Sequence, residues 1–153
     1  MQEEKHYINS IYYQLELTAK YCNYLGCQLT KKINSVLSLD EIVTLDTLAA
    51  NGEMSQRDLA KLILKDRPAT GRILNSLEER GFIIRVADTK NNRLIRKIIL
   101  TDSGKTTLSD ITVKIKDYLQ KISQVVSDKG ISKMKESLNE FREILKQEVE
   151  LNI

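Results

Sequence analysis

Apolar residues recur every three to four positions over the first quarter of the chain and again over its last third. The first stripe runs from about residue 6 to residue 36 and includes Ile8, Ile11, Leu15, Leu25 and Leu29. The later stripes include Tyr118, Ile122, Leu138, Phe141 and Leu145. This spacing predicts long amphipathic helices at both ends of the chain. The first helix is too long for one small core to cover, so it needs another long helix or a second subunit.

Cap signals predict a shorter helix after the first long one. Ser38 followed by Glu41 reads as a capping box, in which the serine accepts a backbone N–H and the glutamate reaches back. Asn51 and Gly52 end this helix, because glycine tolerates the left-handed conformation that a C-cap often needs.

Two further short helices follow, and together they form a helix-turn-helix. Ser55 with Asp58 three residues later predicts the start of the first. Asp66 caps the second, Pro68 lies in its first turn, and Gly81 ends it. About three residues join the two helices, which is typical of this motif.

The hydrophobic period changes directly after Gly81. Residues 82–86 and 94–100 are rich in β-branched residues, and the polar stretch 87–92 between them contains turn formers. This pattern predicts a β-hairpin. A hairpin placed after a helix-turn-helix is a wing.

Basic residues are concentrated in the same stretch. Between residues 55 and 97 there are eleven Lys and Arg against five Asp and Glu, whereas the rest of the chain is slightly acidic. Such a module suits contact with a polyanion, although an ordinary solvated surface can have the same charge.

The sequence offers few residues that could form a catalytic or metal-binding site. The single histidine, His6, lies near a terminus, so no Ser/His/Asp or Cys/His set can be built from it. No glycine-rich phosphate loop follows a strand. Cys22, Cys27 and His6 match no standard zinc spacing. We therefore expect no enzymatic activity, no cofactor and no metal.

The cysteines and the N-terminus indicate a cytoplasmic protein. Two cysteines five residues apart on one helix do not make a disulfide framework. The first ten residues lack an apolar signal core, and no apolar run approaches the ~18 residues of a membrane span. Cys22 falls on the apolar stripe and is expected to be buried, whereas Cys27 is the better candidate for an exposed thiol.

The second helix of the motif carries the candidate DNA contacts. Ile73, Leu74 and Leu77 are expected to face inward. The major groove admits one α-helix, in which arginine can pair with guanine and asparagine with adenine. The residues expected outward or toward the N-terminal end are Arg67, Pro68, Thr70, Gly71, Arg72 and Asn75. Gly71 suggests a close approach of the backbone to DNA.

The preceding helix and the hairpin tip supply supporting contacts. Ser55, Gln56 and Arg57 are expected to position the module against the DNA backbone. Lys90, Asn92 and Arg93 at the hairpin tip suit the electronegative minor groove or the flanking phosphates.

These features together resemble the MarR (multiple antibiotic resistance regulator) family of winged helix-turn-helix transcription regulators. The resemblance covers nearly the whole chain. Its motifs are Ser55-Gln56-Arg57-Asp58-Leu59-Ala60, Leu77-Glu78-Glu79-Arg80-Gly81-Phe82-Ile83, the wing run Asp88-Thr89-Lys90-Asn91-Asn92-Arg93, and Leu100-Thr101-Asp102-Ser103-Gly104, which is similar to the family's Leu-Thr-x-x-Gly.

The resemblance implies a mainly α fold with a small β-wing in one intertwined domain. A dimerisation helix would occupy residues 1–36, the winged helix-turn-helix residues 37–104, and C-terminal dimerisation helices residues 105–153. It implies a homodimer on a near-palindromic double-stranded DNA operator, and a small amphipathic or phenolic effector that relieves repression. The dimerisation candidates are Ile8, Ile11, Leu15, Tyr118, Ile122, Leu138, Phe141 and Leu145.

Several interpretations stay open at this point. Tyr12 and Tyr13 could line a ligand pocket, although packing at the dimer interface is preferred. A thiol- or metal-responsive regulator of the same fold is one alternative. A winged-helix interaction adaptor that does not bind DNA is another, and it predicts acidic or apolar residues where basic ones stand here.

Overall fold

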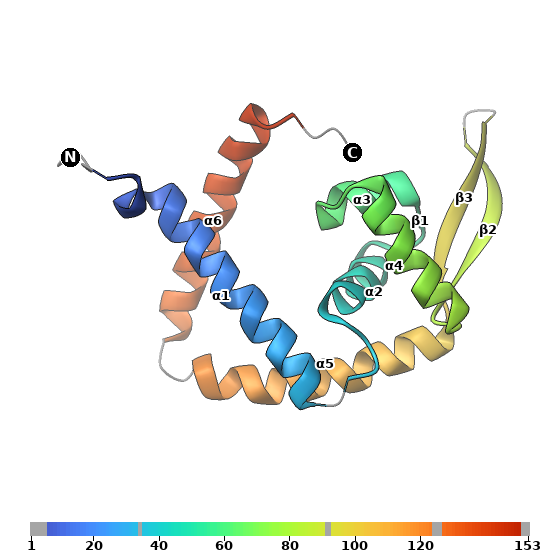
Figure 1. The fold of residues 1–153 in the computed structure, drawn as a ribbon, viewed down its shortest axis with the longest axis horizontal. Coiled ribbons are helices and arrows are strands. Elements are labelled where there is room, and N and C mark those ends of the chain that lie inside the picture. The colour runs from blue at the N-terminus through green and yellow to red at the C-terminus, as the bar shows by residue number, and fades with distance from the viewer. Residues whose placement is uncertain (1–5, 34, 91–92, 124–126, 151–153) are drawn as a thin grey trace. The chain divides into compact units, whose positions relative to one another are not determined.

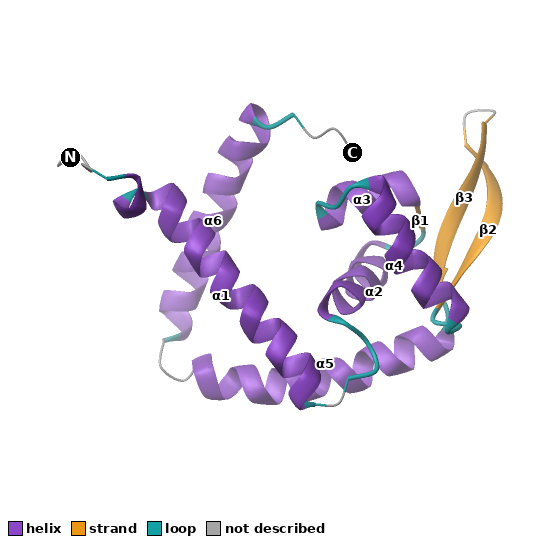
Figure 2. Cartoon of the chain, viewed as in Figure 1, coloured by secondary structure: helices purple, strands orange, loops and turns teal. Residues whose placement is uncertain are grey.

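The computed structural model describes residues 6–33, 35–90, 93–123 and 127–150 (Figure 1). Within these ranges, the side chains at 90, 93–95 and 121–123 are not described. The chain divides into two compact units, residues 1–40 and 41–153. Helices dominate, and the strands form one three-stranded sheet (Figure 2). Among the described helices, none combines the length and apolar composition needed to cross a membrane.

The first unit consists mainly of one long helix. A 3-10 turn, η1 (Tyr7–Asn9), precedes helix α1 (Ile11–Lys32). Ser10 caps α1, because its side-chain oxygen accepts the backbone N–H of Tyr13 at 3.3 Å. The long helix predicted from about residue 6 is therefore confirmed, but it begins one turn later than its apolar stripe.

Helix α2 (Leu39–Asn51) begins just before the boundary between the two units and continues into the second. The elements after it are β1 (Met54–Ser55), α3 (Gln56–Ile63), α4 (Arg67–Glu79), β2 (Ile83–Lys90), β3 (Arg93–Leu100), α5 (Asp102–Ser123) and α6 (Asp128–Glu148). The predicted stops at Gly52 and Gly81 are confirmed. Both glycines have the positive φ of a helix C-cap, +79° and +75°.

The sheet has the strand order β1–β3–β2 with antiparallel pairing. β2 continues to Lys90, which pairs with Arg93, so residues 87–90 are strand and not the turn that their polar composition indicated. Backbone pairing with β3 outweighs that composition. β1 was not predicted, since its two residues are too few to show a period.

Gly130 lies near the start of the last helix. α5 ends at Ser123, and α6 begins at Asp128. Ser127 caps α6 by accepting the N–H of Gly130 at 3.2 Å. Gly130 therefore lies in the first turn, where a backbone N–H needs a capping acceptor.

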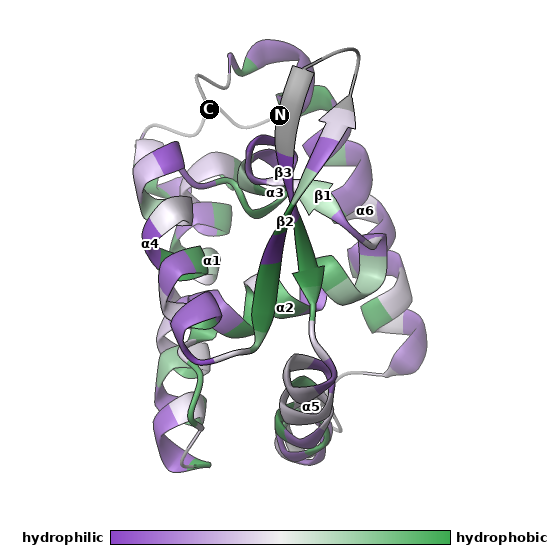
Figure 3. Cartoon of the chain, turned by 90° about the vertical axis from the view of Figure 1, so that its right-hand side faces the viewer, coloured by the Kyte–Doolittle hydropathy of each residue, from purple (hydrophilic) through white to green (hydrophobic). Residues whose placement is uncertain are grey.

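The core of the second unit gathers one apolar face from each of its elements up to α5. Residues with 0–6% exposure include Leu45 and Leu48 of α2, Leu59 of α3, Leu74 and Leu77 of α4, Ile83 of β2, Ile98 of β3, and Leu108 and Ile111 of α5. The hairpin is hydrophobic where it joins this core and turns hydrophilic toward its tip (Figure 3). The core thus holds α3, α4 and the base of the hairpin in one block.

A tight junction joins the hairpin to α5. The Thr101 N–H donates to the carbonyl of Phe82 at 3.1 Å, and the Thr101 hydroxyl donates to the carbonyl of Gly81 at 2.7 Å. That hydroxyl also accepts the N–H of Gly104 at 3.1 Å. A Cβ built on Gly104 would lie 2.2 Å from the Phe82 carbonyl oxygen and 2.8 Å from a methyl carbon of Leu100. Only glycine allows this approach.

We predict that Gly104→Ala destabilises the fold by about 1–3 kcal/mol or more, because the added methyl must displace backbone. At an open helical position the same change would instead stabilise the protein by up to ~1 kcal/mol. Urea unfolding at fixed protein concentration measures the difference. Ser103→Ala, at the exposed neighbouring position, is the control and should change stability by less than about 0.5 kcal/mol. A Gly104→Ala protein as stable as wild type would contradict the junction described here.

Candidate nucleic-acid interface

Two capped helices and a three-residue turn form the helix-turn-helix. The Ser55 hydroxyl accepts the N–H of Asp58 at 3.2 Å and donates to its carboxylate at 2.7 Å. Asp66 accepts the N–H of Ala69 at 2.6 Å. Between the helices, Leu64 adopts the left-handed conformation with φ +51°. Both predicted caps are confirmed, and they set where α3 and α4 begin.

One face of α4 is buried and the other is exposed. Thr70, Leu74 and Leu77, spaced four and three residues apart, have 0% exposure. The exposed side chains of α4 are Arg67, Pro68, Arg72, Asn75 and Glu79. Because a helix repeats every 3.6 residues, burial of the first set directs the last four of these to the opposite side. Arg67 lies on the same side as Leu74 and is exposed as the first residue of the helix. α4 therefore presents two guanidinium groups, a carboxamide and a carboxylate to its surroundings.

Thr70 was expected to face outward, and this expectation is wrong. Its side chain is fully buried, and its hydroxyl donates to the backbone carbonyl of Asp66 at 2.8 Å. The residue lies one helical turn before Leu74, so it shares the inward face. Its methyl group suits that face, and its hydroxyl is satisfied within the helix.

Gln56 ties the start of α3 to α4. Its side-chain amide donates to the backbone carbonyl of Arg67 at 3.3 Å. A Cβ on Gly71 would lie 3.4 Å from the same amide nitrogen. The absence of a side chain at Gly71 thus gives the Gln56 amide room between the helices. The sequence analysis explained this glycine only by a close approach to DNA. Arg57 is exposed on α3.

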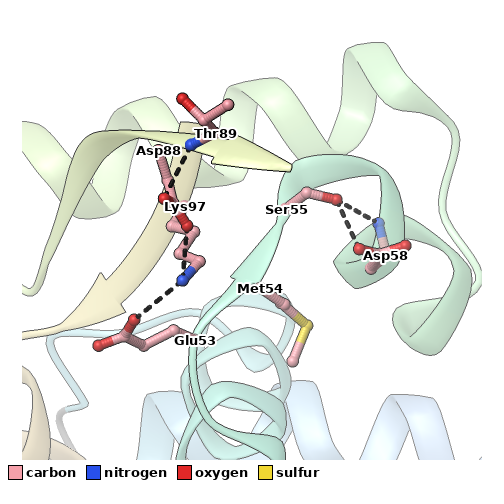
Figure 4. A pocket seen from close by; sticks show the side chains of 7 residues that line it. All are labelled: Glu53, Met54, Ser55, Asp58, Asp88, Thr89 and Lys97. Atoms are coloured by element: carbon pink, nitrogen blue, oxygen red, sulfur yellow. Dashed lines mark hydrogen bonds and ion pairs between the residues drawn. The ribbon is translucent and has the colours of Figure 1, made fainter. Parts of the chain in front are cut away.

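The wing is braced by an ion pair across its two strands. Lys97 of β3 approaches the Asp88 carboxylate of β2 at 2.6 Å and the Glu53 carboxylate at 3.9 Å (Figure 4). Asp88 lies opposite Ile95, two residues from Lys97, so the pair is diagonal on one sheet face. These residues line a hollow of about 360 Å³ beside Ser55 and Asp58.

The contacts shift the pKa values of both partners in opposite directions. Hydrogen bonds from Lys97 and from the Thr89 N–H lower the pKa of Asp88. The hydrogen bond to Asp88 and its charge raise the pKa of Lys97. Both charged forms are therefore favoured at neutral pH, and the hairpin keeps its lysine and carboxylate paired.

The hairpin-tip predictions are only partly covered by the structure. Lys90, the last residue of β2, pairs with Arg93, the first residue of β3, which places them at the tip. Their side chains, and Asn92 entirely, lie outside what the structure describes. Their proposed contacts with the minor groove stay predictions.

The long-range contacts of three charged residues, Glu41, Arg80 and Arg85, were not predicted from the sequence. The Glu41 carboxylate on α2 accepts from the Ser76 hydroxyl at 2.8 Å and pairs with the Arg80 guanidinium at the end of α4. The Glu41 carboxylate is buried beside these partners. Arg85 of β2 contacts α4 from the other side. A charged residue inside the apolar run 82–86 was the available signal for Arg85.

The candidate dimerisation residues are mostly accessible within the single chain. Ile8 and Ile11 are more than half exposed, and Leu138 and Leu145 are each 36% exposed. Leu15, Tyr118 and Phe141 are half-buried, whereas the side chain of Ile122 lies outside the described part. Tyr12 is exposed, and the ring of Tyr13 packs edge-on against Tyr7 with centroids 5.9 Å apart.

Both cysteines have exposed thiols in this chain, so the expectation that Cys22 is buried is wrong. The apolar stripe of α1 passes close to Cys22, but nothing in the structure covers it. Among the described residues, no group of three His, Cys, Asp or Glu is placed to hold a metal ion. The thiol-responsive alternative stays a prediction.

Comparison with known proteins confirms the resemblance to the MarR family. The model of that family matches residues 37–95. The transcriptional regulator SlyA has 25% identity and a TM-score of 0.74, with 91% of this chain and 96% of SlyA covered. Comparison with the curated proteins gives no match.

Two further solved structures share the fold and are described with bound molecules. A Staphylococcus aureus MepR–DNA complex has 20% identity and a TM-score of 0.71, with 89% of this chain and 98% of MepR covered. NadR in complex with 4-hydroxyphenylacetate has 22% identity and a TM-score of 0.73, covering 92% and 96%. The winged-helix fold, mainly α with a small β-wing, is thereby confirmed.

We predict that Asp88 titrates below the ordinary range of an aspartate. Because its pKa is lowered on folding, the ion pair stabilises the wing above the unfolded pKa, and this contribution is lost as pH falls through the folded pKa. Carbon-detected NMR titration measures the midpoint. Lys97→Met should return the midpoint toward the ordinary value, whereas Lys105→Met, on α5, should leave it unchanged. An unchanged midpoint in Lys97→Met would contradict the assignment.

Proposed function

We propose that this chain, whose residues 37–95 carry a MarR-family domain within a winged-helix fold, is a sequence-specific regulator of transcription that binds double-stranded DNA. The observation that carries the proposal is the exposed face of α4. Arg72 and Asn75 project from the side of the helix opposite its buried stripe, and Arg67 is exposed at the first residue of the helix. Their groups suit base edges and phosphates in a major groove, which is wide enough for one α-helix.

The other predicted contacts support this docking. Ser55 caps α3, Gln56 ties α3 to α4 through its hydrogen bond to the Arg67 carbonyl, and Arg57 remains exposed for the DNA backbone. Lys90, Asn92 and Arg93 at the hairpin tip would enter the minor groove or meet flanking phosphates. Pro68 and Gly71 keep side-chain bulk low at the N-terminal end of α4, which leaves room for a close approach to DNA.

We infer a homodimer from the surface of α6. None of the described residues of this 21-residue helix is buried. Leu138, Phe141 and Leu145 lie on one face, because they are three and four residues apart. An amphipathic helix of this kind gains its stability from packing, so an uncovered face calls for a partner. A second copy would also supply a second α4 for a near-palindromic operator.

The predicted division of the chain serves this assembly. Residues 1–36 and 105–153 would dimerise, with Ile8, Ile11, Leu15, Tyr118 and Ile122 adding to the interface, and residues 37–104 would bind DNA. No catalytic role is proposed for any part. A regulator of this kind acts where the DNA is, which agrees with the cytoplasmic location expected from the sequence.

We further propose that the protein is a repressor released by a small aromatic acid or phenol. NadR is described in complex with 4-hydroxyphenylacetate. In this chain, a hollow of about 250 Å³ lies between α2 and α5. Its lining combines apolar Leu108 and Val113 with Lys105, Lys116 and Asp46. Cationic groups beside an apolar floor suit a single ring that carries an acidic group.

We predict that Arg72→Ala weakens binding to a duplex selected by the wild-type protein by about 1–3 kcal/mol. Fluorescence anisotropy at fixed salt measures the affinity, and sedimentation measures the stoichiometry, which should be two chains per duplex. Lys133→Ala removes an exposed positive charge on α6 away from the face of Leu138, Phe141 and Leu145, and it should bind like wild type. Equal binding by Arg72→Ala would remove this residue from the interface.

We also predict that phenolic or aromatic acids release the selected duplex. The probes are 4-hydroxyphenylacetate, benzoate and phenol, titrated into the protein–DNA complex. Lys116→Ala should require at least about tenfold more of the most active probe, and Lys133→Ala on α6 is the matched control. If none of the three probes changes DNA affinity, release by this class of ligand is ruled out.

A further inference from the structure

Arg85 interrupts the apolar start of β2 and points into the protein. Successive strand residues alternate between the two sheet faces. Ile83 has 0% exposure and Ile84 has 46%, so Arg85 shares the inward face with Ile83. Its side chain is only 16% exposed. The guanidinium therefore lies between the hairpin and α4, which are neighbours at the base of the wing (Figure 1).

Three contacts fasten this arginine to two successive turns of α4. Its Nη1 pairs with Glu78 Oε2 at 3.1 Å, and its backbone N–H donates to Glu78 Oε1 at 3.2 Å. Its Nη2 donates to Asn75 Oδ1 at 2.8 Å. Arg85, Glu78 and Asn75 form what we call the β2–α4 bridge. The Glu78 carboxylate neutralises the charge of the Arg85 guanidinium. The Asn75 side chain accepts the hydrogen bond from its Nη2.

The bridge gives the oxygen and the nitrogen of the Asn75 carboxamide different surroundings. Oδ1 accepts from the Arg85 guanidinium, which uses one of its two lone pairs and holds this oxygen toward β2. Among the described residues, nothing takes the hydrogens of Nδ2, and the side chain is exposed. Toward a ligand, Asn75 thus offers a donor.

This difference matters because an asparagine that reads adenine uses both ends of its amide. It donates from Nδ2 to adenine N7 and accepts from adenine N6 with Oδ1. Guanine instead presents two neighbouring acceptors, N7 and O6, and an amide nitrogen with two hydrogens matches them without help from Oδ1. The sequence-based expectation of adenine pairing does not include the effect of Arg85.

We propose that Arg85 is a positioning residue that makes Asn75 a donor-only reader of guanine. The proposal rests on the DNA binding proposed above and specifies one of its contacts. Arg85 itself touches no base. It holds the orientation of the Asn75 amide, and through Glu78 it also holds the angle between α4 and the wing.

The test uses the full chain and duplexes selected from a random library. Selections with wild type and with Asn75→Ala identify the base position that depends on Asn75. We expect guanine there for wild type. In Arg85→Met, which keeps much of the side-chain bulk but frees Oδ1, adenine should gain at least about tenfold over guanine at that position, or about 1.4 kcal/mol.

Glu78→Gln is the matched control within the bridge. It removes the charge of the ion pair but leaves the contact between Arg85 and Asn75 Oδ1, so the selected base should stay guanine. A general loosening of α4 would instead change the preference in both variants. Circular dichroism and thermal unfolding check that each variant is folded.

A second measurement does not depend on the folding of any Arg85 variant. Replacing the guanine with 7-deazaguanine should weaken wild-type binding at least about fivefold and leave the binding of Asn75→Ala unchanged. A base other than guanine at the Asn75-dependent position, or indifference of wild type to the deaza analogue, overturns this inference alone. If wild type enriches no sequence, the proposed function itself fails.

Discussion

The buried stripe of α4 is the constraint on which the interface depends. Thr70, Leu74 and Leu77 have no exposed surface. A helix has only one surface to divide between core and surroundings, so locking these three residues inward decides which side chains can project. Arg72 and Asn75 are exposed because the opposite side of the helix is held in the core. In this helix, the residues packed in the core therefore decide which side chains are exposed.

Charged groups inside the second unit hold α4 from two sides. Glu41 of α2 pairs with the Arg80 guanidinium and accepts a hydrogen bond from the Ser76 hydroxyl. Arg85 of β2 pairs with Glu78 and donates a hydrogen bond to Asn75. Apolar packing alone tolerates small sliding and rotation, whereas hydrogen bonds with fixed directions do not. The helix is thereby set against both the body of the domain and the wing.

The wing is also held by both apolar packing and charged groups, each at a different part of the hairpin. Near the core it is fixed by buried Ile83 and Ile98 and by the glycine junction to α5. Farther out, where there is no core, Lys97 ties Asp88 across the strands and approaches Glu53. A hairpin with this bracing can carry a charged tip at a defined distance from α4.

Features that act over about one helical turn could be predicted from the residues alone. Ser55, Asp66 and Gly81 mark helix ends through groups no more than a few residues away, so their roles could be predicted directly. The stripe of Leu74 and Leu77 indicated the inward face of α4, and with it the exposure of Arg72 and Asn75. Features that depend on distant partners became visible only in the folded chain. Glu41 meets Arg80 across 39 residues, and Arg85 meets Asn75 across ten. Gly104 is required by the Phe82 carbonyl, and β1 exists only because β3 lies beside it. A local pattern records which face is apolar, but it does not record which polar group the fold brings against it.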